Sequence, residues 1–249
     1  VCSSDLQDAG LFLSRIEWNS KNAFFNRDEI YKEIEKIAVE VNGKFNVNYS
    51  DEIPNVAIFV SKQNHCLIDL LWRVRNGELK MKVPLIISNH SDLENIANDF
   101  NIKFAHIDTF NIDKSIVEDQ FLSLLKEYEI DLVVLAKYMQ ILSDSFLKKF
   151  SSIINIHHSF LPAFKGAQPY HRAWKRGVKL IGATAHYVTE DLDEGPIIEQ
   201  CTVNVSHRDE VDDLIRKGRD IERIALARAV RLHLNHQVFV YNSKTAVFD

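Results

Sequence analysis

The chain has 249 residues, a formal net charge of −5 and a hydrophobic content of 46%. These values are typical of a soluble globular protein with one full α/β domain and a smaller second piece. The negative charge gives no general attraction to nucleic acids or anionic membranes. No apolar run approaches the ~20 residues that cross a bilayer. We therefore expect no nucleic-acid partner, no membrane association and no secretion signal.

The three cysteines, Cys2, Cys66 and Cys201, are widely spaced and form no CxxC pair. Three cysteines scattered in this way suggest neither a disulfide framework nor a zinc site. Scattered cysteines are typical of proteins in the reducing cytosol. The sequence therefore favours a cytoplasmic protein.

Residues 1–50 indicate part of a small α+β domain, and 51–55 a short linker. Residues 11–18 and 45–49 each alternate between apolar and polar side chains, which predicts two strands. Between them, apolar residues recur at helical spacing from Asp28, the expected N-cap, to Gly43, the expected stop. Residues 1–10 carry no periodic signal. Strand, helix and strand over so short a span bury little surface by themselves, so we expect half of a domain.

From residue 56 to the end, strands and helices alternate, which predicts a doubly wound, mostly parallel sheet. We expect strands at 56–60, 83–87, 103–107 and 132–136, and helices at 65–75, 92–100 and 115–128. Two antiparallel strands follow at 180–188 and 196–205, then a helix at 209–236 with a break near Gly218, and a terminal hairpin. The catalytic domain is accordingly predicted over residues 56–249.

The stretch NIHHSFLP follows directly on a β-branched strand that begins at Ile153. Asn155 and His157 are two apart, so their side chains point to the same side of an extended backbone. This aims a carboxamide and an imidazole at the carboxyl end of a buried strand, where open α/β sheets bind ligands. A loop with satisfied polar groups is the competing interpretation of this pair.

A second polar loop, TEDLDEGP, contains Asp193 and a glycine, Gly195, that allows close backbone approach. Singly, its acidic residues would be solvated loop charges. Together with Asn155 and His157, Asp193 completes a set suited to attack on an acyl carbon. The carboxamide donates to a carbonyl oxygen, the imidazole shares a proton, and the carboxylate orients a nucleophile.

Other familiar chemistries have no local support. Walker, GxGxxG, GxSxG and HExxH motifs are absent from the sequence. The pair His157 and His158 has no carboxylate or cysteine at ligand spacing beside it, so we expect no metal. A basic cluster at residues 172–179 is interpreted as a solvated helix face.

Residues 56–248 resemble the formyltransferase fold shared by glycinamide ribonucleotide and methionyl-tRNA formyltransferases. The chain is more closely similar to the formyltetrahydrofolate deformylases. The matching stretches include HCLIDLLWR, LAKYMQIL, NIHHSFLP and IGATAHY, with further matches over 164–171 and 193–200. They span nearly the whole second domain and are highly specific.

This resemblance implies a catalytic trio of Asn155, His157 and Asp193. It also implies substrate contacts through a loop whose backbone reads the folate pterin, and through five further residues. The loop comprises Met139, Gln140, Ile141 and Leu142, and the further residues are His65, His158, Lys165, Gly166 and His186. It implies no cofactor, since 10-formyltetrahydrofolate is itself the substrate and water the second reactant.

One departure separates hydrolase from transferase. Ribonucleotide formyltransferases hold the substrate phosphate in a glycine-rich turn after the first strand. Here that turn, SKQNH, has no glycine, and His158 stands where the transferases usually carry proline. Water is therefore the expected acceptor, and the predicted activity is hydrolysis of 10-formyltetrahydrofolate to formate and tetrahydrofolate. A folate-dependent formyltransferase to a small amine or tRNA is the alternative, and an inactive folate-binding or amino-acid-sensing protein is a third.

The resemblance further implies that formate supplies purine biosynthesis and that the reaction balances one-carbon folate pools. Deformylases of this kind begin with a ferredoxin-like ACT domain, and residues 11–49 resemble its second half. The strand and helix that should precede them are not recognisable, which predicts a truncated or degenerate regulatory domain. We expect a homo-oligomer and an amino-acid effector at that domain.

Overall fold

The computed structural model describes residues 2–6, 9–18, 26–163 and 168–248, and divides into two compact units. The first ends at Ile53 and also takes in Phe248; the second spans Pro54–Val247. Among the described helices, none combines the length and the apolarity needed to span a bilayer. The two units are described separately below.

The described part of the first unit contains an antiparallel hairpin and one helix. Strands β1 (Cys2–Leu6) and β2 (Leu11–Arg15) form the hairpin, and α1 (Arg27–Glu40) follows. The β1 strand was not predicted, because the sequence CSSDL neither alternates nor carries an apolar run. The N-cap of α1 is Asn26, whose side chain accepts from the Asp28 N–H, so the expected cap at Asp28 is wrong by two residues.

The strand predicted at 45–49 is wrong. Burial alternates there as in a strand, but these residues pair with no strand in the described part of the chain. Instead their aromatic side chains pack against α1. The Tyr31 and Phe45 rings lie 5.0 Å apart, and the Arg27 guanidinium lies 4.0 Å from the centre of the Tyr49 ring. Alternating burial thus arises from packing against a helix.

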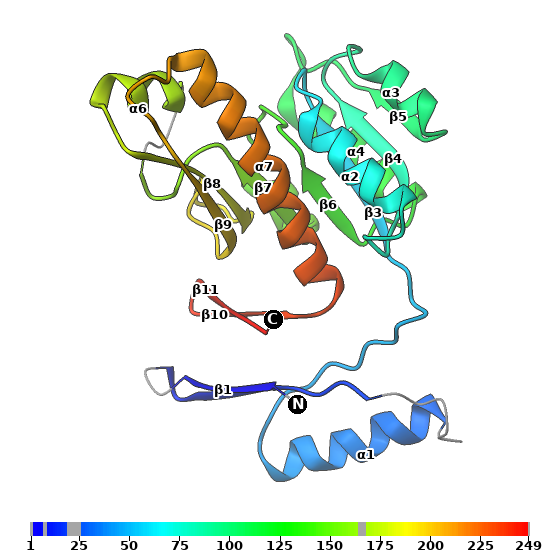
Figure 1. Ribbon diagram of the computed structural model, residues 1–249. Helices are drawn as coiled ribbons and strands as arrows, with labels where there is room; N and C mark the ends of the chain where they lie inside the picture. The colour runs from blue at the N-terminus through cyan, green and yellow to red at the C-terminus, as the bar shows by residue number, and fades with distance from the viewer. Residues whose placement is uncertain (1, 7–8, 19–25, 164–167, 249) are drawn as a thin grey trace. The chain divides into compact units, whose positions relative to one another are not determined.

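Seven of the described strands form one sheet in the second unit, in the order β5-β4-β3-β6-β7-β8-β9 (Figure 1). The first five in that order are parallel, and β8 and β9 run antiparallel to their neighbours. This confirms the predicted doubly wound, mostly parallel sheet. The bounds are β3 (Asn55–Val60), β4 (Lys82–Ser88), β5 (Lys103–His106), β6 (Leu132–Leu135), β7 (Ile153–His157), β8 (Leu180–Tyr187) and β9 (Ile197–Asn204).

Helices cover both faces of this sheet. Helices α2, α3 and α7 contribute to the apolar core of one face, and α4 and α5 to that of the other. Figure 1 shows α2 and α7 lying across the same face. The bounds are α2 (His65–Arg75), α3 (Glu94–Asp99), α4 (Lys114–Glu127), α5 (Asp144–Lys149), α6 (Pro169–Arg176) and α7 (Val211–Leu234), and the terminal hairpin is β10 (Val238–Tyr241) with β11 (Lys244–Val247).

Three features of the helices differ from the predictions. The six-residue α5 was not predicted, and α3 is shorter than expected because residues 91–93 form a turn. The predicted break near Gly218 is absent, since α7 is described without interruption from Val211 to Leu234. A Cβ on Gly218 would lie 2.1 Å from the Tyr170 hydroxyl, so this glycine makes room for a neighbouring side chain.

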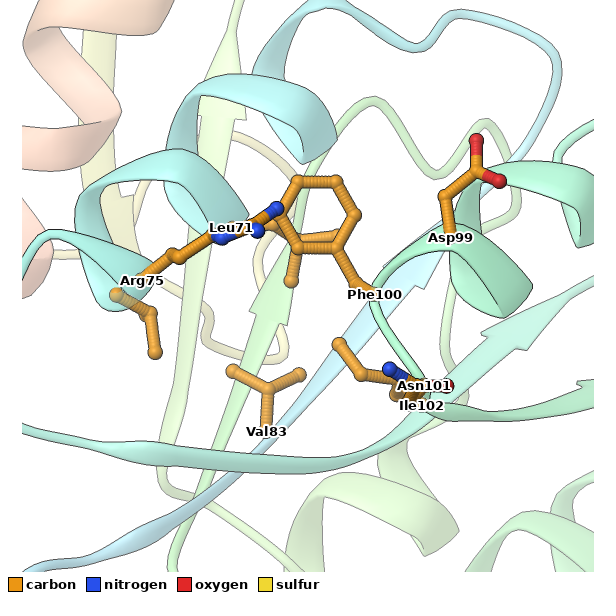
Figure 2. Close-up of a pocket in the computed structure, with 8 residues that line it drawn as sticks. Leu71, Arg75, Val83, Asp99, Phe100, Asn101 and Ile102 are labelled. Carbon is orange, nitrogen blue, oxygen red and sulfur yellow. The ribbon is translucent and has the colours of Figure 1, made fainter.

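The order of the strands determines where in the sheet the candidate site lies. Strand β3 lies between β4 and β6, so the loops that leave β3 and β6 diverge and open a crevice at the carboxyl ends of the strands. Residues after β3, β6 and β7 meet there. At the other end, a hollow of about 440 Å³ includes Arg75, Val83 and Phe100 in its lining (Figure 2), and Asp99 stands apart from the other labelled side chains. None of the predicted site residues lines this hollow.

Candidate active site

The register between β7 and β8 brings Asn155 directly opposite His186. The Asn155 Nδ2 and the His186 Nε2 lie 3.2 Å apart, and the His186 Nδ1 lies 2.9 Å from the Tyr187 carbonyl oxygen. A carbonyl oxygen only accepts, so Nδ1 of His186 carries the proton and Nε2 accepts from Asn155. The carboxamide keeps a second N–H for another acceptor.

Asp193 reaches this pair from the loop between β8 and β9. The loop turns back sharply: Asp193 has a left-handed φ of 58°, and the Tyr187 N–H donates to the Pro196 carbonyl at 2.9 Å. A Cβ on Gly195 would lie only 1.8 Å from the Tyr187 carbonyl oxygen. The interpretation that Gly195 permits close backbone approach is therefore confirmed, and its effect is to fix the position of Asp193.

His157 completes the group. Its Nε2 lies 3.3 Å from one Asp193 carboxylate oxygen, and its Nδ1 lies 3.0 Å from the Ser159 hydroxyl. The other Asp193 oxygen is 3.9 Å from Nε2 of His186. Burial lowers the pKa of His157, and the Asp193 charge opposes this shift. Burial also lowers the pKa of His186, against the effect of its bond to the Tyr187 carbonyl. Both rings are therefore held neutral with a carboxylate beside them.

A hydrogen-bonded support behind His157 escaped the sequence analysis. The Thr184 hydroxyl donates to the Ser159 carbonyl at 2.9 Å and accepts from the Leu161 N–H at 3.0 Å. The Gln200 carboxamide donates to the Thr184 hydroxyl and to the Leu161 carbonyl, each at 3.0 Å. These contacts join β8 and β9 to the turn after β7, so only the register across the sheet reveals them.

The predicted pterin loop, Met139 to Leu142, follows β6. Met139 and Ile141 are exposed, at 60% and 61%, whereas the Leu142 side chain is buried. The Ser61 hydroxyl accepts from the Met139 N–H at 3.0 Å, and Glu118 accepts from both the N–H and the hydroxyl of Ser143. Both ends of the loop are thus anchored while its middle, including Gln140, stays open to solvent.

Only some of the other residues predicted to contact the substrate lie beside His157 and Asp193. His158 stacks on His157, with ring centres 4.8 Å apart. His65 instead contacts Glu222 of α7 at 2.7 Å. Lys165 and Gly166 lie outside the described residues. Of the basic cluster, residues 172, 175, 176 and 179 are exposed, as expected of a solvated face.

Three titratable groups, His65, Cys66 and Glu222, have ligand atoms within 4.8 Å of one another. Their chemistry suits a metal poorly. Burial raises the pKa of the Cys66 thiol, although a thiol must ionise to bind a metal. Lys137, 3.4 Å from Glu222, already supplies a positive charge. The expectation of no metal stays a prediction.

The second unit matches a described family. A formyl transferase family model covers residues 54–230. A formyltetrahydrofolate deformylase of Synechocystis sp. is 58% identical over 240 residues, 96% of this chain and 84% of the relative. The chain belongs to the formyltetrahydrofolate deformylases. This confirms the resemblance seen in the sequence.

Solved structures agree with this family assignment. A deformylase from Pseudomonas putida has a TM-score of 0.93 and 42% identity, covering 99% of this chain and 88% of the other. A glycinamide ribonucleotide transformylase from Symbiobacterium toebii reaches a TM-score of 0.76 at 30% identity, over 82% of this chain and 99% of the other. The deformylase is thus more similar than this transferase in both fold and sequence.

Proposed function

We propose that the chain is a hydrolase that converts 10-formyltetrahydrofolate and water to tetrahydrofolate and formate. The observation that carries this proposal is the convergence of Asn155, His157, His186 and Asp193, in a chain 58% identical to a formyltetrahydrofolate deformylase. A carboxylate, an imidazole and a free carboxamide N–H are the groups that water attack on a formyl carbon requires.

In this mechanism Asp193 orients the water and accepts its proton as the oxygen attacks the formyl carbon. The formyl oxygen takes up negative charge, which the second N–H of Asn155 and a proton on His157 stabilise. The carbon–nitrogen bond then breaks, and the folate nitrogen leaves with the proton that Asp193 accepted from water. The remaining fragment is formic acid, which loses its proton to solvent and is released as formate. His186 holds the Asn155 carboxamide in its orientation through the 3.2 Å contact.

The substrate folate is proposed to bind along residues 139–142, a loop that is anchored at both ends and exposed over residues 139–141. We assign further contacts to His158, Lys165, Gly166 and His186, and propose that neither a cofactor nor a metal takes part. His65 lies against Glu222 and serves instead as support. The released formate would feed purine biosynthesis and adjust one-carbon pools in the cytoplasm.

The first unit is proposed to act as a partial ACT domain with an amino-acid effector, in a homo-oligomer. Its hairpin leaves Phe12 69% exposed, and Val39 on α1 is 75% exposed. Such apolar surface is normally covered by a partner. Light scattering of the purified protein tests the assembly, and a stable monomer at high concentration contradicts it.

Formate release and acceptor choice test the activity. Enzyme, 10-formyltetrahydrofolate and glycinamide ribonucleotide are incubated together, and formate and formylated ribonucleotide are followed. We expect formate at the same rate with and without the ribonucleotide, because the turn between Ser61 and His65 has no glycine to cradle a phosphate. Faster formyl transfer to the ribonucleotide than to water would favour the transferase alternative.

A further inference from the structure

Beside the candidate site lies a second buried group of polar side chains, centred on Lys137. This residue follows β6 with a left-handed φ of 66°, and it is buried. Its Nζ lies 3.4 Å from a Glu222 oxygen and 3.2 Å from Nδ1 of His158. The ammonium therefore bridges α7 and the strand end that carries His157.

Glu222 fixes the charge of this group. It is 1% exposed and accepts from the Tyr170 hydroxyl at 2.6 Å and from His65 at 2.7 Å. Burial opposes its ionisation, but the bond from His65, the Lys137 charge and the bond from Tyr170 outweigh it and lower the pKa of Glu222 to about 2. A buried anion needs a cation, and Lys137 supplies one at 3.4 Å.

An ammonium group has donors and no acceptor. In the Lys137 contact, Nδ1 of His158 must therefore accept, which places the proton of the neutral ring on Nε2. A second positive charge on His158 would face the Lys137 ammonium at 3.2 Å, so the contact also opposes protonation. Two further titratable groups that face this ring are His157, stacked at 4.8 Å, and Tyr170, whose ring centre is 6.4 Å away.

We propose that Lys137 is a positioning residue: held by Glu222, it keeps His158 neutral, protonated on Nε2 and stacked on His157. The inference rests on the proposed function only for its catalytic consequence. With His158 held neutral and stacked on it, the neutral His157 ring keeps its position beside Asp193, where it stabilises the developing oxyanion. The hydrogen-bond assignment itself is independent of the reaction.

Nitrogen-15 NMR of the histidine side chains tests the assignment in the wild-type protein. The His158 signals are identified by their loss in His158→Phe. We expect the pattern of a neutral ring with the proton on Nε2 at pH 7. A proton on Nδ1, or a charged ring at that pH, overturns the proposal whatever the enzymatic activity.

The variant Lys137→Met removes the charge and keeps an unbranched side chain at the left-handed position. Its His158 signals should shift toward a mixture of both tautomers. Formate release should fall about tenfold to a hundredfold in kcat with little change in KM, because His157 loses its fixed neighbour while the folate loop is intact. The acid limb of the pH profile should move to higher pH, since Lys137 lowers the pKa of His157.

The variant Lys148→Met removes an exposed lysine instead and serves as the matched control. It should change none of these readouts. A Lys137→Met protein with wild-type His158 signals and wild-type pH profile overturns the proposal. If wild-type protein releases no formate, the proposed function fails, whereas the tautomer measurement still tests the role of Lys137. If Lys137→Met does not fold, the wild-type spectrum alone decides.

Discussion

Two buried polar groups lie at the end of β7, and they are built differently. In the candidate site, the contacts of Asp193 with His157 and His186 are 3.3 and 3.9 Å, and its side chain is 15% exposed. Around Glu222, the contacts with His65 and Tyr170 are 2.7 and 2.6 Å, and exposure falls to 1%. Long contacts with partial exposure leave room for substrate and water, whereas short, closed contacts hold a charge in place.

The largest expected effect tests the candidate site around Asp193. Asp193→Asn should reduce formate release by about 10²–10⁴-fold while folate binding is retained, because a carboxamide cannot accept the proton of water. Formate release and folate binding are measured on the same preparation. The exposed neighbour in Asp191→Asn is the control. Near wild-type turnover by Asp193→Asn would remove Asp193 from the mechanism.

The loop that fixes Asp193 can be displaced without changing a charge. In Gly195→Ala the new Cβ meets the Tyr187 carbonyl, so the loop must move; we expect about a hundredfold loss of activity and a loss of about 1–3 kcal/mol in unfolding free energy. Gly177→Ala is matched, because its left-handed φ of 69° is strained yet its Cβ meets nothing within 4 Å. It should lose stability and keep activity. Equal activity in both variants contradicts the role of Gly195.

The buried group around Glu222 is tested by Tyr170→Phe, which deletes one hydrogen bond to the Glu222 carboxylate. We expect a loss of about 1–3 kcal/mol at pH 7, measured by urea unfolding. The stabilisation by Glu222 is present above its unfolded pKa of 4.5 and is lost as pH falls toward about 2. The difference between variant and wild type should therefore shrink over that window. A difference independent of pH would indicate lost packing alone.

A smaller effect concerns acid sensitivity. Burial lowers the pKa of His233 to about 4 from 6.5, and the ring contacts the Tyr187 hydroxyl at 2.8 Å. In this window the unfolded chain binds more protons than the folded one, so stability should fall as pH drops from about 6.5 to about 4. His233→Gln should flatten that decline in urea unfolding measured at several pH values. An unchanged slope would assign the decline to other groups.

The smallest expected effect is at the surface. Lys148 and Glu190 form an ion pair of 3.6 Å between exposed side chains, 69% and 55% accessible. Lys148→Ala should change unfolding free energy by less than about 0.5 kcal/mol, because solvent and salt screen such pairs. A larger loss of unfolding free energy, measured by thermal or urea unfolding, would show that exposed ion pairs contribute to stability as well as the two buried polar groups.

The sequence predicted elements best where one periodicity dominated. The bounds of α2 were found to the residue, because apolar side chains recur along His65–Arg75 at helical spacing. Residues 45–49 have the period of a strand but pack on a helix, and Gly218 suggested a break although a tertiary contact with Tyr170 selects it. Local pattern cannot report such contacts.

The same limit applies to the site. Asn155, His157 and Asp193 were named from two short motifs, and the register of β7 with β8 brings them together. Lys137 and Glu222 were not named from the sequence. A glutamate on a long amphipathic helix has the same sequence pattern whether its side chain is solvated or buried. Contacts with residues far away in the chain, His65, Lys137 and Tyr170, distinguish the two cases.

That separation has a consequence for how the molecule matures. His65 and Glu222 are 157 residues apart, so their contact forms only after α7 has been synthesised and has docked on α2. Contacts between such distant residues form late and slowly, because loop closure must be offset before they stabilise anything. A chain emerging from the ribosome therefore completes its first strands long before the charge that holds His158 is in place. Catalytic competence becomes a late event of folding.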